Sequence, residues 1–172
     1  MASSFITMGR VGVLIPGLES QTAQFSRIYS ENCHRVYSLA FWMTDHEQVA
    51  EQVAANVFLR AFASGRPPSA EQIDRALLEE VRELVAMEGL TLCCDAAAES
   101  GSIGRNMKRV HLERAVVQLP ATEKLIFLLH DVEGYAHARI SRLLGITEDE
   151  CRLGLHQARL RIRELVTQIQ QA

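Results

Sequence analysis

Near the C-terminal end of the chain, four basic side chains recur at helical spacing. Arg152, His156, Arg159 and Arg163 follow one another at intervals of 4, 3 and 4 residues. Because an α-helix turns once in about 3.6 residues, this spacing brings the four side chains to one face. Arginines on such a face can contact phosphates or the edge of guanine. A basic stripe is also typical of a helix face that only contacts water, so both interpretations stay open.

The same segment carries a separate apolar stripe, which predicts how the basic face is held. Its members are Cys151, Leu155, Ala158, Ile162 and Leu165. The helix is expected to begin at Thr147, which forms a capping box with Glu150, and to run to about residue 167. A shorter helix over 136–144, which contains Arg139, precedes it and ends at Gly145. Two helices joined by so tight a turn are typical of a helix-turn-helix, whose second helix lies in the major groove. Arg139 therefore joins the candidate DNA-contacting residues.

The rest of the chain also shows helical periodicity and no alternation typical of strands. Capping boxes at Thr44 with Glu47 and at Ser69 with Gln72 are expected to begin the second and third helices. The remaining predicted helices cover about 22–42, 45–63, 70–88, 105–118 and 121–131. The sequence therefore predicts an all-α protein.

The domain organisation follows from a change in composition. Residues 96–104 are rich in Ala, Ser and Gly, which is typical of a linker. We expect an N-terminal extension over 1–20, a small helical domain over 21–95, and a second helical domain over 105–172 that contains the helix-turn-helix.

Charge is distributed unevenly along the chain, whose net charge is -3. Residues 65–104 hold 3 basic and 8 acidic groups, whereas residues 105–172 hold 11 basic and 8 acidic groups. Contacts with phosphate are therefore expected from the C-terminal third. The apolar runs are too short to span a membrane, and no basic start followed by an apolar block suggests a secretory signal. A cytoplasmic location is expected.

Chemistry of other kinds has little support in the sequence. Cys33, Cys93, Cys94 and Cys151 match neither a disulfide framework nor a zinc spacing, and are interpreted as small buried residues. A redox role for Cys93 and Cys94 is the alternative. The histidines show no ligand pairing, and no phosphate loop or catalytic motif is present. Neither an enzyme nor a cofactor or metal site is expected.

Several motifs in the order of the chain resemble a known family. They read Leu119-Pro120-Ala121-Thr122-Glu123-Lys124, Phe127-Leu128-Leu129, Glu133-Gly134-Tyr135, Ile140, Leu144-Gly145-Ile146-Thr147 and Leu155-His156-Gln157-Ala158-Arg159. This pattern resembles region four of the extracytoplasmic-function (ECF) type of sigma factor, in the sigma-70 family. The earlier motifs Ile28-Tyr29, Val36-Tyr37-Ser38-Leu39-Ala40, Ala50-Glu51 and Phe58-Leu59-Arg60-Ala61 are similar to its region two. The resemblance implies that region four recognises the upstream promoter element.

The resemblance also implies a polymerase-binding patch on the second helix, made of Glu51, Gln52, Ala55 and Asn56. Family members usually carry more acidic and glutamine residues there, and here only Glu51 is charged. The third helix has no aromatic residue and is net acidic, so it offers no surface on which unpaired bases could stack. In the second helix of the predicted helix-turn-helix, Gly154 and Gln157 stand at two positions that are usually basic in the family.

The expected function is therefore that of a sigma-like transcription factor, which binds core RNA polymerase and recognises promoter DNA through its C-terminal helix-turn-helix. An anti-sigma factor is a further expected partner. The alternative is a degenerate sigma-like regulator that acts only through contacts with an anti-sigma factor or polymerase, without opening promoter DNA.

Overall fold

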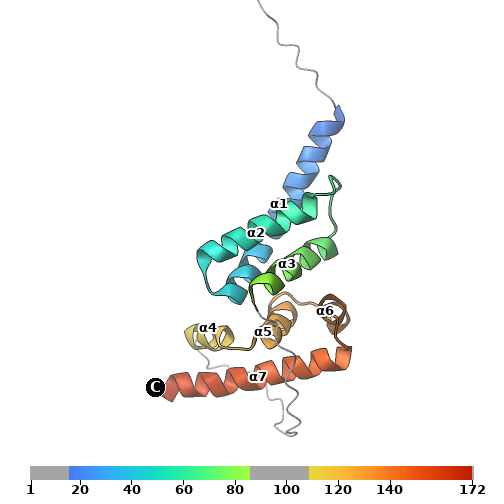
Figure 1. The fold of residues 1–172 in the computed structure, drawn as a ribbon. Coiled ribbons are helices and arrows are strands. Elements are labelled where there is room, and N and C mark those ends of the chain that lie inside the picture. Colours follow the sequence, from blue (N-terminus) through green and yellow to red (C-terminus); the bar gives the residue numbers. More distant parts are fainter. Residues whose placement is uncertain (1–15, 86–108, 172) are drawn as a thin grey trace, which may run out of the picture.

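The computed structural model describes residues 16–85 and 109–171, which form α-helices, one π-helical turn and no strand (Figure 1). This confirms the all-α prediction. The predicted linker over 96–104 and the Cys93–Cys94 pair lie outside the described residues. The helices are α1 (Pro16–Thr44), α2 (Glu47–Phe62), α3 (Ala70–Leu84), α4 (Arg109–Val117), α5 (Ala121–Phe127), α6 (His137–Leu144) and α7 (Glu148–Gln171), with η1 (Leu128–Val132) after α5.

Helices α1 to α3 form an N-terminal lobe, in the upper part of Figure 1. Helix α2 packs against both α1 and α3. The residues that gave these segments their helical periodicity are buried between them, among them Val36, Leu39, Val53, Val57, Ile73 and Val81. Each buried aliphatic side chain of this size contributes roughly 1.5–3 kcal/mol relative to exposure, so the apolar stripes account for the packing of the lobe.

The connection between α1 and α2 differs from the prediction. Thr44 was expected to cap α2, but it is the last residue of α1, and its hydroxyl donates to the Ala40 carbonyl at 2.9 Å. Helix α2 instead follows His46, whose side chain makes no capping hydrogen bond. The predicted capping box was wrong because α1 continues through Thr44, and the chain turns at the next residue, Asp45, which takes a positive φ of 51°.

Helix α3 begins as predicted but ends earlier. The Ser69 hydroxyl accepts from the Gln72 amide at 3.3 Å, and the Gln72 side chain accepts from the Ser69 amide at 2.7 Å, so the predicted capping box is confirmed. The helix was expected to run to residue 88, but Val85 is already extended. Two of its acidic residues, Asp74 and Glu80, are buried rather than exposed.

Helices α4 to α7 form a C-terminal lobe, in which the long α7 lies beneath α4 and α5 (Figure 1). Helix α7 packs against α4, α5 and α6, and its apolar stripe supplies part of the buried core. The predicted members Cys151, Leu155, Ala158 and Ile162 are all buried, and Leu165 is partly buried against the same core.

The fifth predicted helix changes its geometry before it ends. It was expected to run as one α-helix over 121–131, but the α-helical part stops at Phe127 and a π-helical turn follows. The Glu133 amide donates to the Leu128 carbonyl at 3.0 Å, which is the five-residue span of a π-turn. Gly134, with a φ of 70°, then reverses the chain direction towards α6.

An ion pair between a buried carboxylate and a partly exposed arginine joins α5 to α7. Arg161 Nε lies 3.1 Å from Glu123 Oε2, although the two groups do not meet hydrogen-bonding geometry. The Glu123 side chain is only 2% exposed, and burial raises its pKa above the ordinary value of 4.5, while the charge of Arg161 opposes that rise. A carboxylate with a raised pKa destabilises the folded state as pH rises above its unfolded pKa.

We therefore expect Arg161→Ala to lower the free energy of unfolding by about 1–3 kcal/mol at pH 7. This is less than for a fully buried pair because Arg161 is 39% exposed. The loss of unfolding free energy should be smaller near pH 4.5, where protonation of Glu123 removes its uncompensated negative charge. Denaturation of the variant and the wild type at both pH values measures the difference. In the double variant with Glu123→Gln, most of the loss at pH 7 should be recovered. An equal loss at both pH values would contradict this account.

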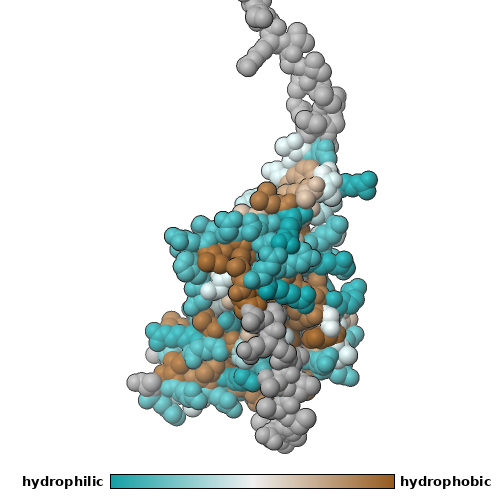
Figure 2. Space-filling view, viewed as in Figure 1, coloured by the Kyte–Doolittle hydropathy of each residue, from teal (hydrophilic) through white to brown (hydrophobic). Residues whose placement is uncertain are grey.

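The surface is mostly hydrophilic, with separate apolar patches on both lobes (Figure 2). In the part of the chain that the structure describes, the large apolar side chains that remain exposed are Tyr29, Leu59, Leu84, Val110 and Val132. Among the described residues, no helix is long and apolar enough to cross a membrane.

Candidate nucleic-acid interface

Helices α6 and α7 form the predicted helix-turn-helix. Helix α6 ends at Gly145, which adopts a left-handed φ of 73° that a side chain would strain. The next helix is capped as expected: the Glu150 amide donates to the Thr147 hydroxyl at 3.2 Å, and the Thr147 amide donates to the Glu150 carboxylate at 2.7 Å. This reciprocal cap gives partners to two backbone amides at the start of α7 that have none within the helix.

At the start of α7, acidic residues hold the first arginine of the predicted basic stripe. Arg152 lies 3.1 Å from Glu148 and 2.8 Å from Asp149, and its side chain is 56% exposed. The two carboxylates favour the positive end of the helix dipole but would repel a phosphate. Arg152 must therefore exchange carboxylate partners for phosphate before it can bind DNA.

About two helical turns after Arg152, Arg159 is held by the π-turn. Its guanidinium donates to both carboxylate oxygens of Asp131, at 2.7 and 3.0 Å, and His130 Nδ1 lies 2.7 Å from the same carboxylate. Burial alone would raise the pKa of Asp131, but the hydrogen bonds from Arg159 and His130 outweigh it and leave the pKa below its ordinary value. The π-turn and α7 are thus joined by a charged contact that the sequence pattern did not predict.

Two histidines stack beside this contact. The rings of His130 and His137 lie 4.5 Å apart between centroids and 24° from parallel, and His137 Nδ1 is 3.5 Å from Cys151 Sγ. Burial, followed by the neighbouring His130 and Arg152, lowers the pKa of His137. The sequence pattern did not predict this pair, because His130 and His137 lie on either side of a turn and not at helical spacing on one helix.

The other members of the stripe are less exposed. His156 and Arg163 are half-buried, while Gly154 and Gln157, which replace two basic residues usual in the resembling family, are buried. Neither polar atom of the Gln157 amide has a hydrogen-bond partner. The stripe is therefore most accessible at Arg152.

Arg139 does not join the stripe. It lies on α6, where its guanidinium turns towards the N-terminal lobe and donates to Asp74 of α3 at 2.5 Å. The structure therefore separates this candidate from the four on α7.

The predicted polymerase-binding patch lies on the outer face of α2. Glu51, Gln52 and Ala55 are exposed, whereas Asn56 is half-buried and donates to Glu80 of α3 at 2.9 Å. Beside the patch, α1 and α2 border a groove of about 420 Å³, lined by Tyr29, Cys33, His34, Tyr37, Glu51, Ala54, Ala55 and Phe58. Asn56 thus has a packing role as well as a place in the patch.

Helix α3 uses its charges within the protein. Glu80 is buried and lies 2.5 Å from Arg60, which also reaches Glu79 and Glu83. Arg75 pairs with Glu71 as the spacing predicts, but Arg82 donates to the Leu144 carbonyl of the other lobe rather than to a neighbouring acid. In residues 16–85 and 109–171, no group of three or more acidic, His or Cys side chains is arranged to hold a metal ion.

These features resemble those of known proteins. Residues 109–162 match the family model for sigma-70, region 4. The fold is similar to that of the sigma factor RpoE from Bartonella quintana, solved in complex with the anti-sigma factor NepR. The two share 15% identity with a TM-score of 0.62, over 83% of this chain and 96% of that one. No curated protein sequence matches the chain.

Proposed function

We propose that this chain binds core RNA polymerase and recognises promoter DNA through α6 and α7. The proposal is supported by the match of residues 109–162 to the sigma-70 region 4 model and by the similarity of the fold to that of a sigma factor. One observation carries this proposal: a capped helix-turn-helix presents Arg152, and less fully the other members of the basic stripe, on the surface of the second helix. A helix in this position can enter a major groove, with its arginines directed at bases or phosphates.

In this proposal, the N-terminal lobe binds polymerase through the patch on α2. Glu51 is its one charged member, and the groove beside it is lined by aromatic side chains such as Tyr29 and Phe58. Aromatic residues beside a rim of polar groups are typical of protein interfaces.

We expect Glu51→Lys to weaken capture of core RNA polymerase by roughly tenfold, since charge reversal at an interface rim costs affinity and slows association. Binding of immobilised wild-type and variant protein to purified core enzyme measures the change. Glu71→Lys is the matched control, because it reverses an exposed charge on α3 outside the patch. Equal capture of all three proteins would contradict a polymerase site on α2.

The same proposal predicts weak opening of promoter DNA. Capturing unpaired bases commonly depends on aromatic stacking worth roughly 1–3 kcal/mol per base. Helix α3 has no aromatic residue. Its exposed acids Glu71, Glu79 and Glu83 are paired with Arg75 and Arg60, but acidic residues still outnumber basic ones on this helix, which disfavours contact with phosphate. Permanganate footprinting with core polymerase and this protein should show little thymine reactivity near the start site. Strong reactivity there would contradict the role assigned to α3.

The second candidate function is a regulator that acts only through protein contacts. It is favoured by the acidic first turn of α7, where Glu148 and Asp149 hold Arg152. The solved relative was crystallised with an anti-sigma factor, which makes such a protein a candidate partner here. The two functions differ in one result: a chain of the second kind binds core polymerase or an anti-sigma factor but shows no salt-dependent affinity for DNA.

A further inference from the structure

The two lobes meet on a buried carboxylate. Asp74 of α3 has a side chain only 4% exposed, and it receives one guanidinium from each lobe. Arg35 of α1 donates to Oδ1 and Arg139 of α6 donates to Oδ2, both at 2.5 Å. A charge removed from water in this way requires its partners, because an unpaired buried carboxylate is strongly unfavourable.

A tyrosine completes this contact, and Arg35, Asp74, Tyr135 and Arg139 together are called the Asp74 cluster. The Tyr135 hydroxyl accepts from Arg35 at 2.7 Å and donates to Asp74 at 3.1 Å. The guanidinium of Arg139 also lies over the Tyr135 ring, 3.8 Å from its centroid. Burial raises the pKa of Tyr135 to about 12, so the hydroxyl remains a donor near neutral pH.

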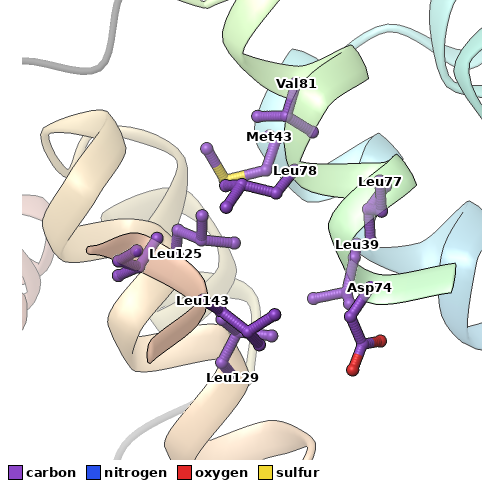
Figure 3. A pocket seen from close by; sticks show the side chains of 10 residues that line it. Leu39, Met43, Asp74, Leu77, Leu78, Val81, Leu125, Leu129 and Leu143 are labelled. Carbon is purple, nitrogen blue, oxygen red and sulfur yellow. The ribbon is translucent and has the colours of Figure 1, made fainter. Parts of the chain in front are cut away.

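The apolar part of the same interface is incompletely filled. Leucines from both lobes, together with Met43 and Val81, surround a cavity of about 20 Å³, and the Asp74 carboxylate points away from them (Figure 3). A void of this size has room for one water molecule at most, and its apolar walls would leave that water without partners. The Asp74 cluster, with the Arg82 hydrogen bond to the Leu144 carbonyl at 3.1 Å, therefore supplies the directional contacts between the lobes.

We propose that the Asp74 cluster is a latch that holds the lobes closed and keeps Arg139 from DNA until it is released. The inference rests on the proposed DNA-binding function. In a helix-turn-helix, the first helix crosses the DNA backbone, where a basic residue contacts phosphate. The Arg139 side chain is 35% exposed, but the hydrogen bond of its guanidinium to Asp74 and its packing on Tyr135 hold it towards the N-terminal lobe and compete with that contact. A partner that binds the open arrangement more tightly would release the latch by shifting the population.

The test compares full-length wild type with Asp74→Ala, using small-angle X-ray scattering and binding to a fluorescent DNA duplex selected by the wild-type protein from a random pool. We expect a larger radius of gyration and DNA affinity raised by about 5- to 150-fold, the usual range of such couplings. Glu79→Ala is the matched control, since it removes the same charge from an exposed site on α3 and should leave the radius unchanged. Tyr135→Phe keeps both ion pairs and should shift both measurements less, in the same direction.

Circular dichroism shows whether each variant is folded. If Asp74→Ala is unfolded, the measurements on Tyr135→Phe decide whether the latch exists. An unchanged radius in the folded variants would overturn the latch. A larger radius with unchanged, measurable DNA affinity would overturn its inhibitory role. The absence of DNA binding by every protein, at low salt and with the lobes open, would overturn the DNA-binding function and this inference together.

Discussion

Replacing Leu155 by alanine is expected to lower the free energy of unfolding by about 2–5 kcal/mol. Leu155 is 4% exposed and lies in the core that α7 shares with α4, α5 and α6. Truncation removes the transfer energy of the lost atoms and leaves a cavity, because helices joined by short connections relax only partly. The variant should also bind DNA poorly at temperatures where the wild type is folded.

Chemical denaturation followed by helical circular dichroism measures this loss. Leu59→Ala is the matched control, since it makes the same change on a helix at a side chain that is 71% exposed, where about 0.5 kcal/mol or less is expected. Fluorescence of Trp42, the one tryptophan in the sequence, reports on the N-terminal lobe. A loss below about 1 kcal/mol for Leu155→Ala would contradict the orientation of α7, because a buried leucine costs more.

DNA affinity is expected to fall steeply as salt is raised. The stripe of Arg152, His156, Arg159 and Arg163 can neutralise a few phosphates, which predicts a slope of about -2 to -4 for log affinity against log salt. Between 50 and 200 mM salt, that slope lowers affinity by roughly 15- to 250-fold. Fluorescence anisotropy with a DNA duplex selected by the protein, measured across this salt range, gives both affinity and slope.

The double variant Arg152→Ala with Arg159→Ala should bind more weakly and with a shallower slope, since two phosphate contacts are lost. The double variant Arg27→Ala with Arg75→Ala is the control, because it removes equal charge from exposed sites in the N-terminal lobe. A third protein, with Glu148→Gln and Asp149→Asn, should bind more tightly because Arg152 loses the carboxylates that hold it. If the stripe variant and its control keep the same affinity and slope, the stripe does not contact DNA.

Local patterns were sufficient to predict most of the helices. The stripe of Cys151, Leu155 and Ile162 is buried as expected, and the capping boxes at Ser69 and Thr147 form. These predictions held because helical burial and capping depend on residues within one or two turns of each other. The box at Thr44 failed for a local reason: the chain turned at Asp45, a residue later, and left the hydroxyl bonded inside α1.

The sequence by itself thus determined an all-α chain, the helix-turn-helix and the basic stripe on its second helix. Only the tertiary structure decided which charged side chains are paired within the protein and which remain free to contact a partner. Asp74 belongs to the third helix, which the sequence describes only as net acidic, yet it is buried against Arg35 and Arg139, which lie 39 and 65 residues away. In the same way, Arg159 is paired with Asp131 across 28 residues. Helical spacing reports only the face of a helix that a side chain occupies, whereas its ionic partner depends on the helices packed against that face.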